Sequence, residues 1–95
     1  MRKKIWVYGL DNGNEVIRKA WFFDNISNQN LENLATNWKA EDGCSRVFRV
    51  AASNDLWECW IDYIKTRFSR NGVHAFAKMV FVNYLETEGT ELAEA

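Results

Sequence analysis

The chain of 95 residues contains no proline, a single histidine and only two cysteines. A zinc-type site needs three or four suitable ligands, and His74 with two distant cysteines does not supply them. The segment Asp11-Asn12-Gly13-Asn14 is too short for a calcium loop and is typical of a turn. We therefore expect no metal site and no cofactor.

A recognisable catalytic motif is also missing. Cys44 and Cys59 could act as nucleophiles only with His74, and nothing in the sequence brings either of them to it. Glu58 and Asp62, four residues apart, are typical of a solvated helix face. The five glycines never cluster, which excludes a phosphate-binding loop. We expect that the chain is not an enzyme.

No apolar run approaches the roughly 18–20 residues of a membrane span. The basic start Met1-Arg2-Lys3-Lys4 resembles that of a signal peptide, but Tyr8 and Asp11 interrupt the apolar stretch that should follow. We expect a cytoplasmic protein without membrane contact. There, Cys44 and Cys59 should be reduced, although the sequence leaves a disulfide between them open.

Acidic residues gather at one end of a chain whose net charge is −1. Four of the 13 acidic residues follow Leu85, so residues 1–84 hold 12 basic and 9 acidic groups, a net charge of +3. That is too weakly basic for a dedicated nucleic-acid binder, and the acids are too few for a DNA mimic. We expect one domain over residues 1–86 and an acidic, frayed tail over residues 87–95, which is either solvated or a contact.

Tryptophan is what the sequence holds in excess. A chain of 11.1 kDa buries about 65% of its surface on folding, and every aromatic side chain could fit inside such a core. Composition therefore allows an exposed aromatic patch without requiring one. Aromatic side chains anchor interfaces as readily as cores, which suggests a domain whose role is contact rather than chemistry. The five tryptophans are Trp6, Trp21, Trp38, Trp57 and Trp60.

Two runs rich in β-branched and aromatic residues, 4–10 and 15–23, flank the turn Asp11-Asn12-Gly13-Asn14. Asn-Gly between such runs predicts a β-hairpin, because both residues tolerate positive φ. A similar run over residues 45–51 predicts a third strand.

Apolar residues recur at helical spacing over positions 31–38 and predict a helix over residues 28–41. Ser27 or Asn28 would be its N-cap, and Gly43 its stop.

A second helix is predicted over residues 55–69, with Asp55 as N-cap and Glu58 completing a capping box. One face of it is an apolar stripe, of which we expect Trp57, Trp60 and Phe68 to line the core. The stripe consists of Trp57, Trp60, Ile61, Ile64 and Phe68.

Asn71-Gly72 should end that helix. Residues 73–86 favour a third helix, and a strand over residues 79–84 is the open alternative. The order β-β-α-β-α-(α or β) indicates an α+β fold, in which two or three helices cover one face of a small antiparallel sheet.

Basic residues alternate with aromatic ones along the predicted strands, so a weak nucleic-acid-binding sheet face is an alternative function. Alternation of this kind is equally typical of any sheet with one polar face, which makes this the weaker hypothesis. Its phosphate contacts would come from Arg18, Lys19, Arg46 and Arg49.

The stronger hypothesis is a small protein-binding module. Both faces of the predicted hairpin carry large apolar side chains, and we expect helices to cover only one. Another protein, a second copy of the chain or solvent would cover the other face and the open sheet edge. No motif identifies a family, but small size without catalytic chemistry is typical of phage or mobile-element proteins that inhibit one host protein. An inhibitor or adaptor is therefore the specific form of this hypothesis, with contact residues Trp6, Tyr8, Arg18 and Trp21.

Overall fold

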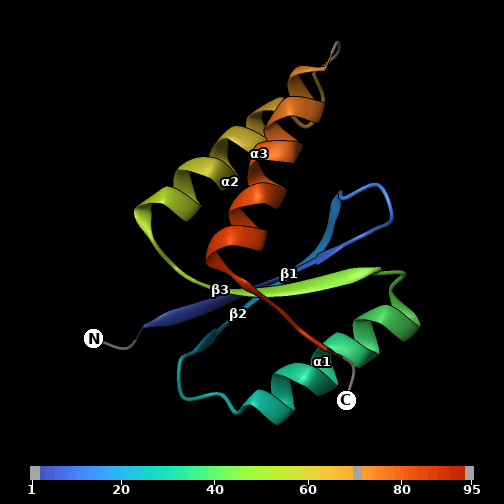
Figure 1. Ribbon diagram of the computed structural model, residues 1–95, viewed down its shortest axis with the longest axis vertical. Helices are drawn as coiled ribbons and strands as arrows, with labels where there is room; N and C mark the ends of the chain where they lie inside the picture. The colour runs from blue at the N-terminus through green and yellow to red at the C-terminus, as the bar shows by residue number, and fades with distance from the viewer. Residues whose placement is uncertain (1–2, 70–71, 94–95) are drawn as a thin grey trace.

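The computed structural model describes residues 3–69 and 72–93, whose arrangement Figure 1 shows. Within these residues the fold is α+β, as predicted, with a four-stranded antiparallel sheet and three helices. Arg2, Asn71 and Glu94, which enter the predictions above, lie outside the described residues. The segment after Gly72 is a helix, and the strand alternative for it is wrong. The elements are β1 (Lys4–Leu10), β2 (Val16–Phe23), α1 (Asn28–Glu41), β3 (Arg46–Ala51), α2 (Asn54–Thr66), α3 (Val73–Glu88) and β4 (Thr90–Glu91).

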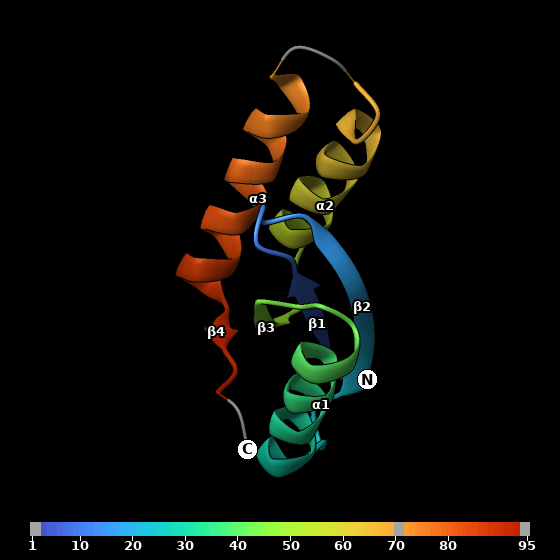
Figure 2. The ribbon, with the colours of Figure 1, turned by 90° about the vertical axis from the view of Figure 1, so that its right-hand side faces the viewer.

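The strands follow the order β2-β1-β3-β4 across the sheet, and every neighbouring pair is antiparallel. Tyr8 in the centre of β1 lies opposite Lys19 on one side and Phe48 on the other. Figure 2 shows β2 and the short β4 at opposite edges of the sheet. The two edges therefore differ, because β2 presents eight residues and β4 only two.

The predicted hairpin joins β1 to β2, but its turn differs from the one that Asn-Gly suggested. Asn14, with φ of 62°, carries the positive φ, and Gly13 does not. The carboxylate of Asp11 accepts hydrogen bonds from the backbone N–H groups of Gly13 and Glu15, both at 2.9 Å. An aspartate side chain thus organises a longer connection than a two-residue turn.

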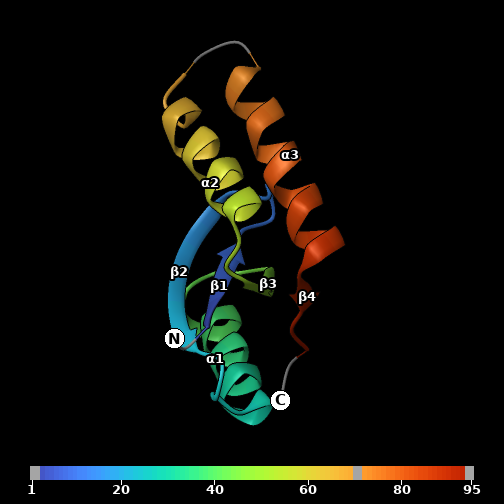
Figure 3. The ribbon, with the colours of Figure 1, turned by 90° about the vertical axis from the view of Figure 1, so that its left-hand side faces the viewer.

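Helices cover both faces of the sheet, so the prediction of one covered face is wrong. Side chains alternate along a strand, and Tyr8 and Phe48 point towards α2 and α3 while Val7 and Val47 point towards α1. Figures 1 and 3 show α1 on the opposite side of the sheet from the other two helices. The physical reason is that both sets of strand side chains are apolar, and each set needs its own cover.

Serine side chains cap the first two helices. Ser27 caps α1 by accepting from the N–H of Asn30 at 3.1 Å, as predicted. Ser53, and not Asp55, caps α2 by accepting from the N–H of Leu56 at 3.1 Å. The helix α2 therefore spans Asn54–Thr66, whereas the prediction was residues 55–69.

Trp60 lies in the core, as predicted, but the other core residues of α2 differ from the predicted stripe. Leu56, Trp60 and Tyr63 are buried against the sheet and α3. Trp57 and Phe68 are exposed, which contradicts their predicted place in the core. Apolar side chains occupy two neighbouring faces of this helix, and the sheet covers only one of them.

The acidic end of the chain is bound to the sheet, and fraying is the wrong prediction for residues 87–92. α3 continues to Glu88, and β4 pairs with β3. Leu92 is buried in the core on the α1 side, and its N–H donates to the carbonyl of Val47 at 2.8 Å. Arg46 pairs with Glu91 at 3.1 Å and with Glu86 of α3 at 3.6 Å, so two of the four acidic residues after Leu85 contact a strand.

Candidate functional site

Of the four predicted contact residues, one lies inside the protein and a second is half-buried. Tyr8 has no exposed surface, which is a correction to its predicted role in partner binding. Burial together with the nearby Tyr84 raises its pKa well above the ordinary value. Trp6 is half-buried, 5.9 Å from the ring of Tyr8 and 5.1 Å from that of Trp57 between ring centres. These rings form an aromatic layer between β1 and α2.

Arg18 and Trp21 are exposed, but on opposite faces of β2. The guanidinium of Arg18 lies 5.1 Å from the ring centre of Trp38 and 3.4 Å from the carboxylate of Asp42, on the α1 side. Trp21 is 44% exposed on the other side, with the ammonium of Lys4 4.4 Å above its ring. The four predicted residues therefore do not form one contact surface.

The predicted nucleic-acid-binding residues are also divided between the two faces. Arg18 and Arg49 lie on the α1 side, whereas Lys19 and Arg46 lie on the side of α2 and α3. Arg49 donates to the side-chain oxygen of Asn28 at 2.9 Å, and the ammonium of Lys19 lies 5.0 Å from the ring of Trp60. Arg46 is paired with glutamates, as described above. No single basic face results from these positions.

A polar cluster around Glu15 joins the hairpin turn to α2 and α3. Tyr63 donates its hydroxyl proton to the carboxylate of Glu15, His74 hydrogen-bonds to the same group, and the ammonium of Lys78 lies 3.7 Å away. The Tyr63 hydroxyl in turn accepts from the N–H of Val16 at 3.1 Å. Sequence reasoning missed this cluster, because its members are distant in the chain and belong to no motif.

The pKa values in this cluster indicate a structural role. Burial alone would raise the pKa of Glu15, but the hydrogen bonds from Tyr63 and His74 and the nearby positive groups lower it overall. Burial and the bond to Glu15 raise the pKa of Tyr63 to about 12. A carboxylate made less basic and a phenol made less acidic favour neither a general base nor a nucleophile.

The cysteines contribute no second polar site. Both are free, and burial raises the pKa of each thiol, which lowers the fraction of reactive thiolate. Cys44 is packed on the α1 side, and Cys59 lies on α2 facing α3. In the described part of the chain, His74 makes no hydrogen bond to either of them.

Over residues 3–69 and 72–93, no group of three or more His, Cys, Asp or Glu side chains is placed to hold a metal ion. Among the same residues, no helix has the length and apolar character needed to cross a membrane.

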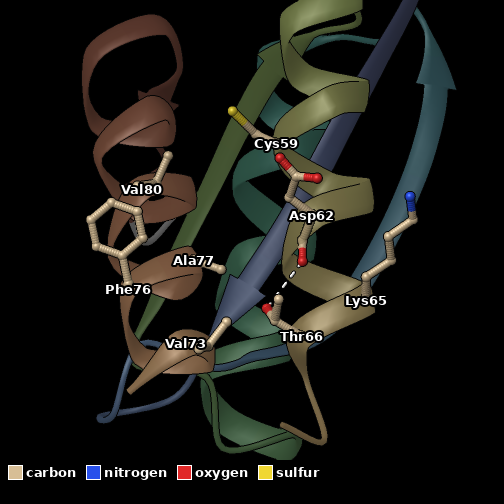
Figure 4. Close-up of a pocket in the computed structure, with 8 residues that line it drawn as sticks. All are labelled: Cys59, Asp62, Lys65, Thr66, Val73, Phe76, Ala77 and Val80. Atoms are coloured by element: carbon tan, nitrogen blue, oxygen red, sulfur yellow. Dashed lines mark hydrogen bonds between the residues drawn. The ribbon is translucent and has the colours of Figure 1, made fainter. Parts of the chain in front are cut away.

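Exposed apolar side chains of α3 line a groove between α2 and α3, which we call the helical groove (Figure 4). Phe76 is 63% exposed, and Val73 and Val80 are also exposed, whereas the exposed Met79 lies outside the groove, beside Asn14 and Lys78. The groove has a volume of about 320 Å³. Its walls are Val73, Phe76, Ala77 and Val80 from α3 and Cys59, Asp62, Lys65 and Thr66 from α2.

A second exposed apolar area lies between β2 and α2, which we call the β2–α2 surface. It includes Trp21, which is the exposed one among the three aromatic residues predicted as contacts. Ile17, Ile64 and Phe68 line a hollow between the two elements, and the other exposed apolar side chains of β2 and α2, which we include in this surface, are Trp21, Phe23, Trp57 and Ile61. The spacing of the α2 residues was visible in the sequence, but it suggested a core stripe.

Comparisons with protein-family models, with curated proteins and with solved structures found no match to this chain.

Proposed function

We propose that this chain is a small non-enzymatic protein-binding module, which holds its partner in the helical groove. The observation that carries the proposal is the exposure of Val73, Phe76 and Val80 along the α3 wall of this groove. These side chains expose apolar surface to water although the protein has two well-packed cores. Contiguous exposed apolar patches on a small protein are typical of interaction sites.

The groove suits an apolar segment of another protein, such as one face of an amphipathic helix. Its α3 wall is apolar, and its α2 wall carries Asp62, Lys65 and Thr66 at the rim. Grooves of this kind bind helices through apolar anchors three or four residues apart. Charged groups at the rim can fix the orientation of such a segment.

The more specific proposal is an inhibitor or adaptor of phage or mobile-element type, acting on a host protein in the cytoplasm. Its support is the small size of the chain and the lack of a catalytic motif. A protein of this kind needs only a stable scaffold and one contact surface.

The test is capture of a partner from lysate of the source cell or its host by the tagged chain, with nuclease present. Phe76→Ala should abolish capture of a protein band that the natural chain retains, while circular dichroism stays unchanged. Trp21→Ala is the matched control, because it removes an exposed aromatic side chain from the β2–α2 surface and should retain the band. The reverse result would contradict the helical groove and support Trp21, the contact predicted from the sequence. A band that disappears with nuclease would indicate nucleic-acid binding instead.

A further inference from the structure

The outer edge of β2 carries unpaired backbone groups. Asp24 donates its N–H to the carbonyl of Lys3, and antiparallel strands alternate between residues bonded to one neighbour and to the other. Ala20 and Phe22 are therefore bonded to β1, and the N–H and C=O groups of Lys19 and Trp21 point outwards. Within the described residues no hydrogen bond reaches these outward groups. Such an edge is a template for another strand.

The side chains next to this edge are apolar and exposed. Trp21, Phe23, Trp57 and Phe68 expose between 36% and 91% of their surface. A whole aromatic side chain has an area of about 150–250 Å², so the exposed parts of these four side chains add up to roughly 300–500 Å². A standard interface buries about 800 Å² on each partner, so the aromatic members alone supply around half of that area. The isoleucines of the β2–α2 surface add to it.

Charge selects the way in which two β2 strands could pair. In an antiparallel pair related by a two-fold axis, the residue on the axis lies opposite the same residue of the other copy. Arg18 or Lys19 on the axis would place two like charges opposite each other, which is destabilising. Ala20 on the axis avoids this and sets Lys19 of each copy opposite Trp21 of the other.

Hydrogen bonding favours the same register. With Ala20 on the axis, the outward groups of Lys19 pair with those of Trp21, and two such residue pairs give four backbone hydrogen bonds. With Trp21 on the axis, its outward groups pair with those of Trp21 in the other copy, and Lys19 lies opposite Phe23. The carbonyl of Phe23 already accepts from the N–H of Ile26 at 3.1 Å. In the Trp21 register the N–H of Lys19 would therefore face an acceptor that is already engaged, whereas in the Ala20 register it faces the outward carbonyl of Trp21.

We propose that two copies of this chain form a dimer through antiparallel pairing of their β2 strands, with Ala20 on the two-fold axis. The two four-stranded sheets then become one continuous sheet of eight strands. Lys19 faces an aromatic ring, and the apolar side chains of α2 next to β2 lie beside the second copy. The pairing leaves the helical groove free, so it does not depend on the function proposed above.

The first test is the mass of the protein in solution, measured by analytical ultracentrifugation over a range of concentrations. The natural chain should form dimers, and Lys19→Pro should raise their Kd at least about tenfold by removing two of the four backbone bonds. Proline is tolerated there because the N–H of residue 19 is not bonded to β1. Lys19→Ala is the matched control, since it keeps the N–H and should weaken the dimer less. Monomers at up to about 1 mM protein, or a dimer that Lys19→Pro leaves unchanged, would overturn the proposal.

The second test fixes the register and does not depend on how Lys19→Pro folds. In the proposed pair the two Ala20 Cα atoms lie about 4.5 Å apart, within the range of a disulfide. Ala20→Cys should therefore give a covalent dimer with diamide, whereas the natural chain under the same conditions should not. Arg18→Cys should also stay uncrosslinked, because its two copies would lie about 13 Å apart. Crosslinking through residue 18 and not through residue 20 would overturn the register.

Discussion

Gly9 shows how one residue without a side chain determines the packing on the α1 face. A Cβ at this position would lie 2.5 Å from the sulfur of Cys44 and 3.0 Å from the ring of Trp38. Both neighbours are buried, and little room exists for them to move. Gly9→Ala should therefore lower the free energy of unfolding by about 1–3 kcal/mol, measured by urea denaturation.

The matched control for Gly9 is Gly13→Ala in the hairpin turn. A Cβ there would meet only the Asp11 carboxylate, at 3.4 Å, and the backbone φ of Gly13 is not positive. This variant should change stability by less than about 0.5 kcal/mol. Equal losses in the two variants would contradict the packing described around Gly9.

Glu15 should make the stability of the protein depend on pH. Its pKa is lowered below the ordinary value of 4.5, so the folded state favours the ionised form. The stabilisation is then fully present above pH 4.5 and is lost as the pH falls through the lowered pKa. Glu15→Gln should cost about 1.5–3 kcal/mol at pH 7 and less at low pH.

The measurement for Glu15 is the difference in unfolding free energy between Glu15→Gln and the natural chain, followed from pH 7 to below pH 4.5. Glu88→Gln, which removes an exposed carboxylate at the end of α3, is the control and should show little pH dependence. A difference that stays constant with pH would show that the carboxylate charge does not stabilise this cluster.

At the scale of elements, Ser53 does more than cap α2. Its hydroxyl accepts from the N–H of Leu56 and is also hydrogen-bonded to the hydroxyl of Tyr84 on α3, at 2.7 Å. Ser53→Ala should cost about 1–2 kcal/mol, since it removes the cap and this link between helices. Ser27→Ala removes a cap alone and should cost less. Thermal unfolding of both variants checks the order, and a reversed order would exclude a contribution from Tyr84.

Helix and strand positions were largely predictable because they depend on local patterns. The β-branched and aromatic run of β1 beside the turn, and the spacing from Leu31 to Trp38 in α1, each indicate one kind of element. α2 was different, because two apolar stripes lie side by side on it. Periodicity placed the helix but could not tell which stripe the sheet covers, so Trp57 was assigned to the core although it is exposed.

The candidate surfaces could not be predicted, because they depend on contacts between distant segments. Tyr8 and Trp21 both belong to aromatic strands, but Tyr8 lies in a central strand beneath α2 and α3, and Trp21 in an outer strand. The sequence carries no signal for strand order. The exposure of Phe76 likewise follows from the side of α3 that faces away from the sheet.

At the scale of the whole molecule, the end of the chain closes the fold. Leu92 follows β4 and packs with Val47 and Trp38 in the core on the α1 side, although it comes after a helix on the opposite side. The ammonium of Lys39 on α1 also lies 3.4 Å from its carbonyl. The final residues therefore connect the two layers that the sheet separates.

Leu92→Ala should lower the free energy of unfolding by about 2–4 kcal/mol, because it removes a buried side chain from the smaller of the two cores. The loss should appear in hydrogen exchange as faster exchange in α1 and β3, while the N–H groups of α2 keep their protection. Glu91→Gln is the control, since it removes the pairing with Arg46 and leaves Leu92 in place; being exposed, it should cost less than about 1 kcal/mol. If Leu92→Ala were as mild as Glu91→Gln, the end of the chain would not close the fold, and the predicted frayed tail would describe the protein in solution better.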